Sequence, residues 1–225
     1  MDAPPRLHPA TSPPARDPRR PRRARRLQKR GLAAQIAAVK QAHPAARVTV
    51  WAEDEHRLGL FPVRRRVWAP RGQRPTAHVE RHFQWLYVYG FVRPSTGQSW
   101  WCLLPTVNAL AFGLALATFA RDEGIDAAHH AVLVVDQAGW HIAHDLEVPE
   151  GVHLALLPSY SPELQPAERL WTLIDEPIAN RAFPDLDALE AVLVDRCRSL
   201  EADPDRLKAH TRYHWWPQEP LPGYP

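Results

Sequence analysis

The sequence predicts an α/β fold in which a mixed five-stranded sheet is flanked by helices. Five short runs rich in β-branched and aromatic residues are interspersed with helical patterns along the chain. The first three strands follow one another without an intervening helix, and consecutive strands of this kind pair antiparallel. The later two strands need crossover connections, which make them parallel. Together these observations indicate a layered α/β domain.

The chain begins its regular structure with a helix and a strand. A helical pattern over residues 27–42 stops at His43-Pro44. The run VTVWA at residues 48–52 predicts the first strand. A short basic hairpin, with arms at residues 58–62 and 66–68, is expected to follow it.

The middle of the chain supplies the other four strands. The runs at residues 83–92 and 99–104 flank the turn sequence RPSTGQ and predict a hairpin. Residues 109–121 have a helical pattern that ends at glycine. Wholly apolar runs at residues 131–135 and 152–157 are typical of strands buried on both faces.

The last third of the chain is predicted to be mostly helical. Residues 166–176 and 186–200 both have helical patterns. The aromatic and proline-rich end, residues 213–225, is expected to pack irregularly or to fray.

Charge divides the chain into unequal parts. Residues 1–30 hold ten Lys or Arg, two Asp and seven Pro, whereas the remainder has a net charge of −5. We therefore predict a disordered Pro/Arg-rich arm at 1–30, a catalytic domain at 31–216 and a tail at 217–225. The arm either binds a polyanion such as nucleic acid or is a solvated segment, and it is alternatively an artefact of where the reading frame was started.

Other properties exclude several classes of protein. No run approaches eighteen apolar residues, and the N-terminus has no apolar core of a signal peptide. The only cysteines, Cys102 and Cys197, form no disulfide framework and have no partner at zinc spacing. We expect a cytoplasmic protein without a membrane partner.

Two aspartates stand at strand ends. Asp136 follows the buried run VLVV, at the sheet edge where α/β proteins bind ligands, although it alternatively caps the next turn. Asp54 follows the first strand on the same face as Val48 and Val50, while Glu53 and Glu55 point to the other face. The three consecutive acids are either solvated or neighbours of a cation.

Glu168 lies in the segment LPSYSPELQPAERLW, residues 157–171. Pro166 suits a first helical position, and Glu168 then lies in the first turn at the edge of an apolar stripe. There it either complements the helix dipole or reaches the sheet edge. Three carboxylates without a Cys/His cluster suit Mg²⁺ or Mn²⁺, and two such ions can serve phosphodiester chemistry.

Three blocks carry a resemblance to a known family: WAEDEHRLGL at 51–60, VLVVDQAGWH at 132–141, and the segment at 157–171. In their order and spacing the chain resembles the catalytic domain of DDE transposases of the Tc/mariner superfamily, specifically its insertion-sequence 630 group, over about residues 32–216.

The resemblance implies a ribonuclease H-like fold and metal-dependent cutting and joining of DNA at transposon ends. It implies that Asp54, Asp136 and Glu168 are the catalytic, metal-binding triad for two Mg²⁺ or Mn²⁺ ions. The implied partners are DNA, as transposon ends and target, and further copies of the chain in a homo-oligomer on DNA.

The sequence departs from the family pattern at several points. Gln165 and Gln137 stand where Asn is usual, and the spacing from Asp136 to Glu168 is slightly tight. Because Gln is a poorer helix cap than Asn, we expect the helix bearing Glu168 to start late or fray. The helix-turn-helix modules that the family carries ahead of this domain have no counterpart in the sequence.

Several further residues are candidates for the site or for DNA contact, and each also has a structural interpretation. His141 either orients the metal site or touches DNA, or it is structural. The Trp residues 85, 100 and 101 fill the core or stack on bases. Five arginines around the predicted hairpin contact DNA phosphates or form a solvated face: Arg64, Arg65, Arg66, Arg71 and Arg74.

Two rival functions remain open on the sequence. One is a transposase remnant that binds DNA or a partner without catalysis. The other is a different ribonuclease H-like nuclease, such as one that acts on RNA–DNA hybrids.

Overall fold

A single sheet organises the computed structural model, which describes residues 20–66, 71, 82–158 and 161–217. Its strand order is β3-β2-β1-β4-β5. The strands are β1 (Arg47–Gly59), β2 (Trp85–Arg93), β3 (Gln98–Leu104), β4 (His129–Val135) and β5 (Val152–Leu156). The pairs β1–β2 and β2–β3 are antiparallel, and the pairs β1–β4 and β4–β5 are parallel. The predicted mixed five-stranded sheet of a ribonuclease H-like fold is confirmed.

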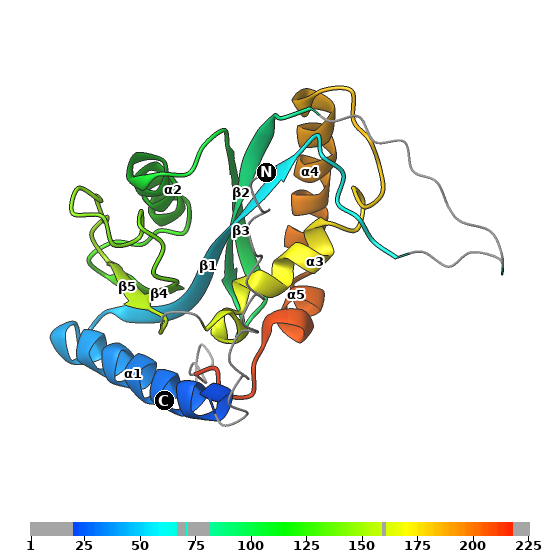
Figure 1. Cartoon of the computed structure of the whole chain (residues 1–225). Coiled ribbons are helices and arrows are strands. Elements are labelled where there is room, and N and C mark those ends of the chain that lie inside the picture. Colours follow the sequence, from blue (N-terminus) through cyan, green and yellow to red (C-terminus); the bar gives the residue numbers. More distant parts are fainter. Residues whose placement is uncertain (1–19, 67–70, 72–81, 159–160, 218–225) are drawn as a thin grey trace, which may run out of the picture.

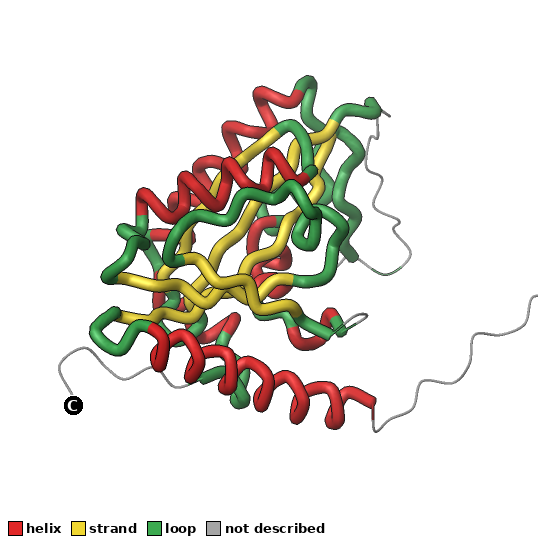
Figure 2. The backbone as a smooth tube through the Cα atoms, turned by 90° about the vertical axis from the view of Figure 1, so that its left-hand side faces the viewer, coloured by secondary structure: helices red, strands yellow, loops and turns green. Residues whose placement is uncertain are grey.

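Helices cover both faces of this sheet, as Figure 1 shows. On one face lies α2 (Ala109–Asp122), and on the other lie α3 (Leu170–Ile174), α4 (Leu186–Glu201) and α5 (Pro204–Thr211). The long helix α1 (Arg20–Ala42) packs against β1 and β4, where its Leu32 and Val39 join the core of the α3 face, and Figure 2 shows it running below the strands. Two short 3-10 turns, η1 (Pro162–Leu164) and η2 (Ala167–Arg169), precede α3.

The sheet separates two hydrophobic cores because side chains alternate along each strand. On β1, Trp51 packs with Phe112 and Phe119 of α2, whereas Val50 and Ala52 face α3 and α4. This alternation continues past the apolar residues. Asp54 therefore shares the α3 face, and Glu53 and Glu55 the α2 face, as the sequence predicts.

The first helix differs from its prediction. It begins at Arg20 rather than at Leu27. The prolines of the N-terminal segment end at Pro21, in the first helical turn, where the missing N–H would have no partner. The predicted disorder of the arm at 1–30 is therefore wrong for residues 20–30, which are helical. Residues 1–19 lie outside the described residues, so disorder stays a prediction for them.

The predicted basic hairpin after β1 is wrong in its first arm. Leu58 belongs to β1 and pairs with Leu86 of β2. The second half of β1 thus has β2 as its partner, which removes the need for a separate hairpin. Arg66 lies in a loop, and residues 67–68 lie outside the described residues.

The C-terminal part contains a helix that the sequence patterns did not indicate. The Asp203 side chain accepts a hydrogen bond from the Arg206 N–H, and Pro204 opens α5. After α5, Trp215 and Trp216 are buried in the core that faces α3 and α4. The chain therefore packs irregularly up to that point rather than fraying. No helix of the described residues has the length and apolar character to cross a membrane.

Candidate active site

Asp54 lies on β1 directly opposite Gly90 of β2. Its Oδ2 accepts a hydrogen bond from Trp171 Nε1 of α3 at 2.7 Å. A Cβ at position 90 would come within 2.8 Å of the Trp171 indole, so glycine leaves the room that this ring occupies. Asp54, Gly90 and Trp171 thus form one contact between sheet and helix.

The electrostatic surroundings of Asp54 are unfavourable to its charge. Burial raises the pKa of the Asp54 carboxyl to about 7, and the Trp171 hydrogen bond opposes this rise. The charges of Glu55, Glu168 and Asp136 raise the pKa further. Asp54 is therefore a carboxylate that a nearby cation would favour strongly.

Asp136 follows the last residue of β4. In the parallel β1–β4 pair, Ala52 lies beside Val134, so Asp54 and Asp136 stand at equivalent positions along neighbouring strands. Asp136 Oδ1 accepts hydrogen bonds from the Ala138 N–H and from His141 Nδ1, both at 2.8 Å. The turn-capping role that the sequence left open is thus present, yet 54% of the side chain remains exposed.

Glu168 lies in the 3-10 turn η2 and is exposed. Burial raises the pKa of this carboxyl, and the charges of Asp136 and Glu163 raise it further. Since Asp136 and Glu168 both raise the pKa of Asp54 as well, the three acids lie within one another's electrostatic field. Elements far apart in the sequence thus bring the three predicted site residues to one end of the sheet.

The helix that carries Glu168 starts late, as the sequence predicts from Gln165. The α-helical hydrogen bonding begins only at Leu170. Gln165 is nevertheless buried and bonded at both ends of its amide. Its Nε2 donates to the Glu53 carbonyl at 2.8 Å, and its Oε1 accepts a long bond from the Ala167 N–H at 3.4 Å. Gln165 therefore ties the η2 turn to β1 more firmly than it caps the helix.

A second group of acids lies on the opposite face of β1. Glu55 Oε1 accepts hydrogen bonds from Trp140 Nε1 at 2.7 Å and from His141 Nε2 at 3.2 Å. Glu53 Oε2 lies 3.6 Å from His141 Nε2, and neither oxygen of this fully buried carboxyl has a hydrogen-bond partner among the described residues. The expected solvation of these acids is wrong for Glu53.

His141 joins the two groups. Burial disfavours its positive charge, but hydrogen bonds to Asp136 and Glu55 outweigh burial and raise the pKa of His141 to about 10. The hydrogen bond between His141 and Asp136 also lowers the pKa of Asp136. Burial and the charge of Glu55 raise the pKa of Glu53 well above its usual range. His141 is thus a buried side chain that holds Asp136 by a hydrogen bond, which favours the structural interpretation, while a role in orienting a metal site stays a prediction.

The sequence predicts one part of this second group, the shared face of Glu53 and Glu55, but not the other part, His141. The alternation along β1 places Glu53 and Glu55 on one face, but nothing local shows that His141 lies across from them. Their contact joins residues 86 positions apart, between β1 and the loop after β4.

The candidate arginines behave differently from one another. Arg65 donates from Nη2 to the Thr172 carbonyl at 2.6 Å and lies 3.8 Å from Asp175, so it is committed to α3. Arg64 lies over the Phe61 ring and is exposed, as are Arg66 and Arg71. Arg74 lies outside the described residues. Contact of Arg64, Arg66 and Arg71 with DNA phosphates stays a prediction.

The three tryptophans that the sequence assigned to core or base stacking make contacts within the protein. Trp100 packs edge-on against Phe91 and bonds Asp122, and Trp101 bonds Ser99. The Arg57 guanidinium lies over the Trp85 ring. These contacts favour structural roles.

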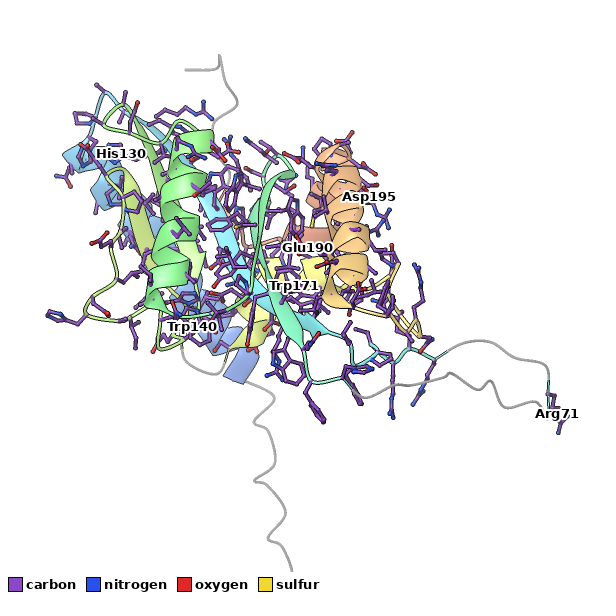
Figure 3. All side chains as sticks on the ribbon, turned by 90° about the horizontal axis from the view of Figure 1, so that it is seen from above. Arg71, His130, Trp140, Trp171, Glu190 and Asp195 are labelled. Atoms are coloured by element: carbon purple, nitrogen blue, oxygen red, sulfur yellow. The ribbon has the colours of Figure 1, made fainter. Side chains whose placement is uncertain are left out.

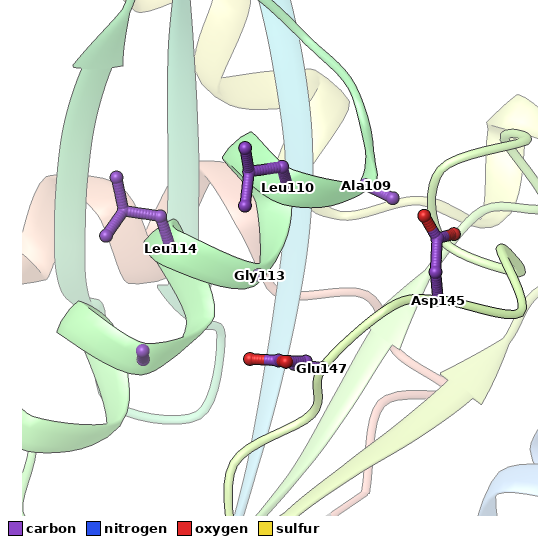
Figure 4. Close-up of a pocket in the computed structure, with 7 residues that line it drawn as sticks. Ala109, Leu110, Gly113, Leu114, Asp145 and Glu147 are labelled. Atoms are coloured by element: carbon purple, nitrogen blue, oxygen red, sulfur yellow. The ribbon is translucent and has the colours of Figure 1, made fainter.

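A surface hollow of about 310 Å³ lies beside α2, away from the acids (Figure 4). Its lining includes Leu110, Gly113, Leu114, Asp145 and Glu147. None of the three predicted site acids lines it. This hollow is therefore separate from the candidate active site at the end of the sheet.

The class of protein follows from comparison with a known family. Residues 49–190 match DDE superfamily endonucleases, and this stretch contains Asp54, Asp136 and Glu168. The chain belongs to the DDE superfamily endonuclease family. The resemblance drawn from the three sequence blocks is confirmed at this level.

Particular relatives are of two kinds. Uncharacterized protein y4pE/y4sA of Sinorhizobium fredii (strain NBRC 101917 / NGR234) is 40% identical over 104 residues, which cover 46% of this chain and 76% of that protein. The solved catalytic domain of Mos1 mariner transposase is 18% identical, with a TM-score of 0.47 over 90% of this chain and 99% of that chain.

A further solved structure, a Mos1 transposase paired-end complex with the left transposon end, is 16% identical, with a TM-score of 0.47 over 95% of this chain and 67% of that chain. The family assignment rests on the sequence match over residues 49–190.

Proposed function

We propose that this chain is the catalytic domain of a DNA transposase, which cleaves DNA at transposon ends and joins the freed ends to target DNA. The observation that carries the proposal is the electrostatic coupling of Asp54, Asp136 and Glu168 at one end of the sheet, within a family of endonucleases. The proposed partners are transposon-end DNA, target DNA and further copies of the chain in a homo-oligomer.

The donor set fits a pair of Mg²⁺ or Mn²⁺ ions. All three side chains offer oxygen, which these hard cations prefer. The raised pKa values of Asp54 and Glu168 reflect burial first and neighbouring negative charge second, and a bound cation would offset both. When bound, such ions activate the attacking oxygen and stabilise the leaving oxygen of a phosphodiester.

The surrounding side chains prepare the acids for this role. Among the described residues, hydrogen bonds engage Oδ2 of Asp54 and Oδ1 of Asp136, which leaves the other oxygen of each carboxylate for a cation. Trp171 fixes the orientation of Asp54, and His141 that of Asp136. Glu168 would complete the ligand shell of one ion.

The proposed reaction has two displacements. A water oxygen attacks the phosphorus at the transposon end, the bond from phosphorus to the 3′-oxygen breaks, and the 3′-oxygen leaves as a hydroxyl. This hydroxyl then attacks a target phosphodiester and displaces a 3′-oxygen there. The number of phosphodiester bonds is conserved in the second step, so no energy source is needed.

The direct test is cleavage of duplex DNA that mimics the element end, in Mg²⁺. We expect Asp136→Asn to lose roughly 100-fold or more in rate, because outer-shell partners of a metal alone are worth about 10- to 100-fold. Asp145→Asn, an exposed aspartate beside α2, is the matched control and should cleave like wild type. Equal cleavage by wild type and Asp136→Asn would rule out the mechanism.

The basic N-terminal segment favours a second candidate, a remnant that binds DNA without cleaving it. This alternative predicts DNA binding that weakens steeply with salt and is lost when residues 1–30 are deleted. It also predicts no cleavage by wild type. An RNA–DNA hybrid of the same sequence in the cleavage assay tests the third possibility, a hybrid-specific nuclease.

A further inference from the structure

Three histidines meet at the end of the sheet that is remote from the acids. His43 follows α1, His130 lies in β4 and His153 lies in β5. One ring nitrogen from each lies within 4.8 Å of the other two. His130 Nδ1 and His153 Nε2 are 2.8 Å apart, and the His43 ring centroid is 3.9 Å from that of His130.

This cluster is separate from the candidate active site. His130 is near the start of β4 and Asp136 follows its end, a separation of roughly 20 Å at about 3.3 Å per residue. Figure 3 labels His130 and Trp140 at opposite ends of the side of the domain that carries α2. A ligand of the histidines would therefore not touch the carboxylates.

The hydrogen bonds of His130 prepare one ring nitrogen as a ligand. His130 Nε2 lies 3.2 Å from the Ala127 carbonyl, which can only accept, so Nε2 carries the proton. Its Nδ1 is then unprotonated, and the lone pair of this nitrogen accepts a hydrogen bond from His153 Nε2. A backbone carbonyl on the far nitrogen is the usual outer-shell partner of a metal-binding histidine.

The remaining two rings can supply their lone pairs at small cost. In the metal-free protein His153 Nε2–H donates a hydrogen bond to His130 Nδ1. A shift of this proton to His153 Nδ1, the other tautomer of the ring, would leave the lone pair of His153 Nε2 for a metal. His43 is partly exposed, so its ring can turn toward the same point. His130 by contrast is buried, which makes it the fixed member of the group.

We propose that His43, His130 and His153 bind a divalent transition metal, with Zn²⁺ as the best match. Imidazole nitrogen suits zinc, copper and nickel, whereas magnesium prefers oxygen. Three protein ligands leave the fourth position of a tetrahedral ion for water.

The three proposed ligands come from different elements, so a bound ion would link these elements. Gln35 of α1 already donates to the Leu154 carbonyl of β5 at 2.8 Å, so α1 lies against this edge of the sheet. His43 is bonded as the continuation of α1, through its N–H to the Val39 carbonyl. A metal held by all three histidines would clamp the end of α1 to β4 and β5.

The test is a titration of the chelator-treated full chain with Zn²⁺, and with Co²⁺ as a coloured probe, in excess Mg²⁺ to occupy the acids. We expect one equivalent to bind, with visible Co²⁺ absorption typical of tetrahedral coordination and a rise in Tm. His43→Ala and His153→Gln should each weaken binding by at least about tenfold, because even outer-shell partners are worth that much. His144→Ala, an exposed histidine elsewhere, should bind like wild type.

Several results would overturn the proposal. One is the absence of stoichiometric Zn²⁺ binding by the folded wild type. Another is binding that survives both His43→Ala and His153→Gln, or that is lost only with His141→Asn, which would assign it to the cluster of Glu53, Glu55 and His141. Circular dichroism of each variant separates loss of ligand from loss of fold, and the buried His130 is left unchanged for that reason.

Discussion

The two faces of β1 hold neighbouring carboxylates in opposite circumstances. Asp54 shares its face with Trp171 and reaches toward Asp136 and Glu168, so negative charges gather there, and of these three acids only Asp136 bonds His141 among the described residues. Glu53 and Glu55, one residue away on either side, point to the α2 face and surround His141. The comparison teaches that one face neutralises its acids internally, while the other leaves charge for an external cation.

The largest expected effect is on the internally neutralised face. His141→Ala would leave Glu53 and Glu55 buried without their cation, and removal of one member of a buried ion pair costs about 3–5 kcal/mol. We expect a loss of this size in the free energy of unfolding, measured by urea denaturation. His144→Ala is the matched control, expected within about 0.5 kcal/mol of wild type.

Glu53→Gln tests the balance between His141 and the buried acids from the side of the acid. Glu53 has a raised pKa, and its carboxyl has no hydrogen-bond partner in the part of the chain that the structure describes. A protonated carboxyl resembles an amide in shape and charge. Glu53→Gln should therefore change the free energy of unfolding much less than His141→Ala does. If the two variants were equally unstable, His141 would not be the group that balances this face.

The next effect concerns the contact that holds the open face together. In Gly90→Ala the new methyl group would press on the Trp171 indole, and overpacking of this kind costs about 1–3 kcal/mol. We expect destabilisation in this range by urea denaturation and slower DNA cleavage, because Asp54 loses its fixed orientation. Gly139→Ala, where a Cβ meets nothing within 4 Å, is the control for adding a methyl group.

The titration of Asp54 gives a more specific effect, which is small over any one pH unit. Its folded pKa of about 7 exceeds the usual unfolded value of about 3.9, so the folded state binds more protons between those pH values. Stability should therefore fall as pH rises from about 4 to 7, with a slope of at most about 1.4 kcal/mol per pH unit from this group.

The measurement is urea denaturation across this pH range in a metal chelator, for wild type and Asp54→Asn. The difference between the two slopes isolates Asp54, and Mg²⁺ should reduce that difference by favouring the ionised carboxylate. Parallel pH profiles for the two proteins in chelator would show that Asp54 is not perturbed.

The smallest effect is expected from the single hydrogen bond to Asp54. Trp171→Phe keeps an aromatic ring but removes the donor, and a hydrogen bond to a charged group contributes about 1.5–3 kcal/mol at most sites, less where the acceptor is half protonated. Because this bond lowers the pKa of Asp54, the variant should titrate above pH 7. NMR detection of the Asp54 carboxyl carbon would show this, and an unchanged midpoint would contradict it.

The sequence predicted much of this arrangement for a physical reason. Strand ends and side-chain alternation are local properties, so Asp54, Asp136 and the separation of Glu53 from Asp54 could be read from short runs of residues. The late start of α3 likewise follows from Gln165, a poor cap.

What the sequence did not predict depends on contacts between distant segments. The partnership of His141 with Glu53 and Glu55 joins β1 to the loop after β4. The second bond of Gln165, to the Glu53 carbonyl, joins the η2 turn to β1. The three histidines come from α1, β4 and β5, and no spacing in the chain marks them as a group.

The 3-10 turn that carries Glu168 has a mechanical consequence. Asp54 is held by the hydrogen-bond ladder of the sheet, which is stiff, and Asp136 directly follows β4. Glu168 by contrast stands on a short turn whose poorer hydrogen bonds deform more easily. Any change in spacing among the three acids as a substrate arrives or departs would fall mainly on Glu168. The site thus combines two rigid supports with one compliant support.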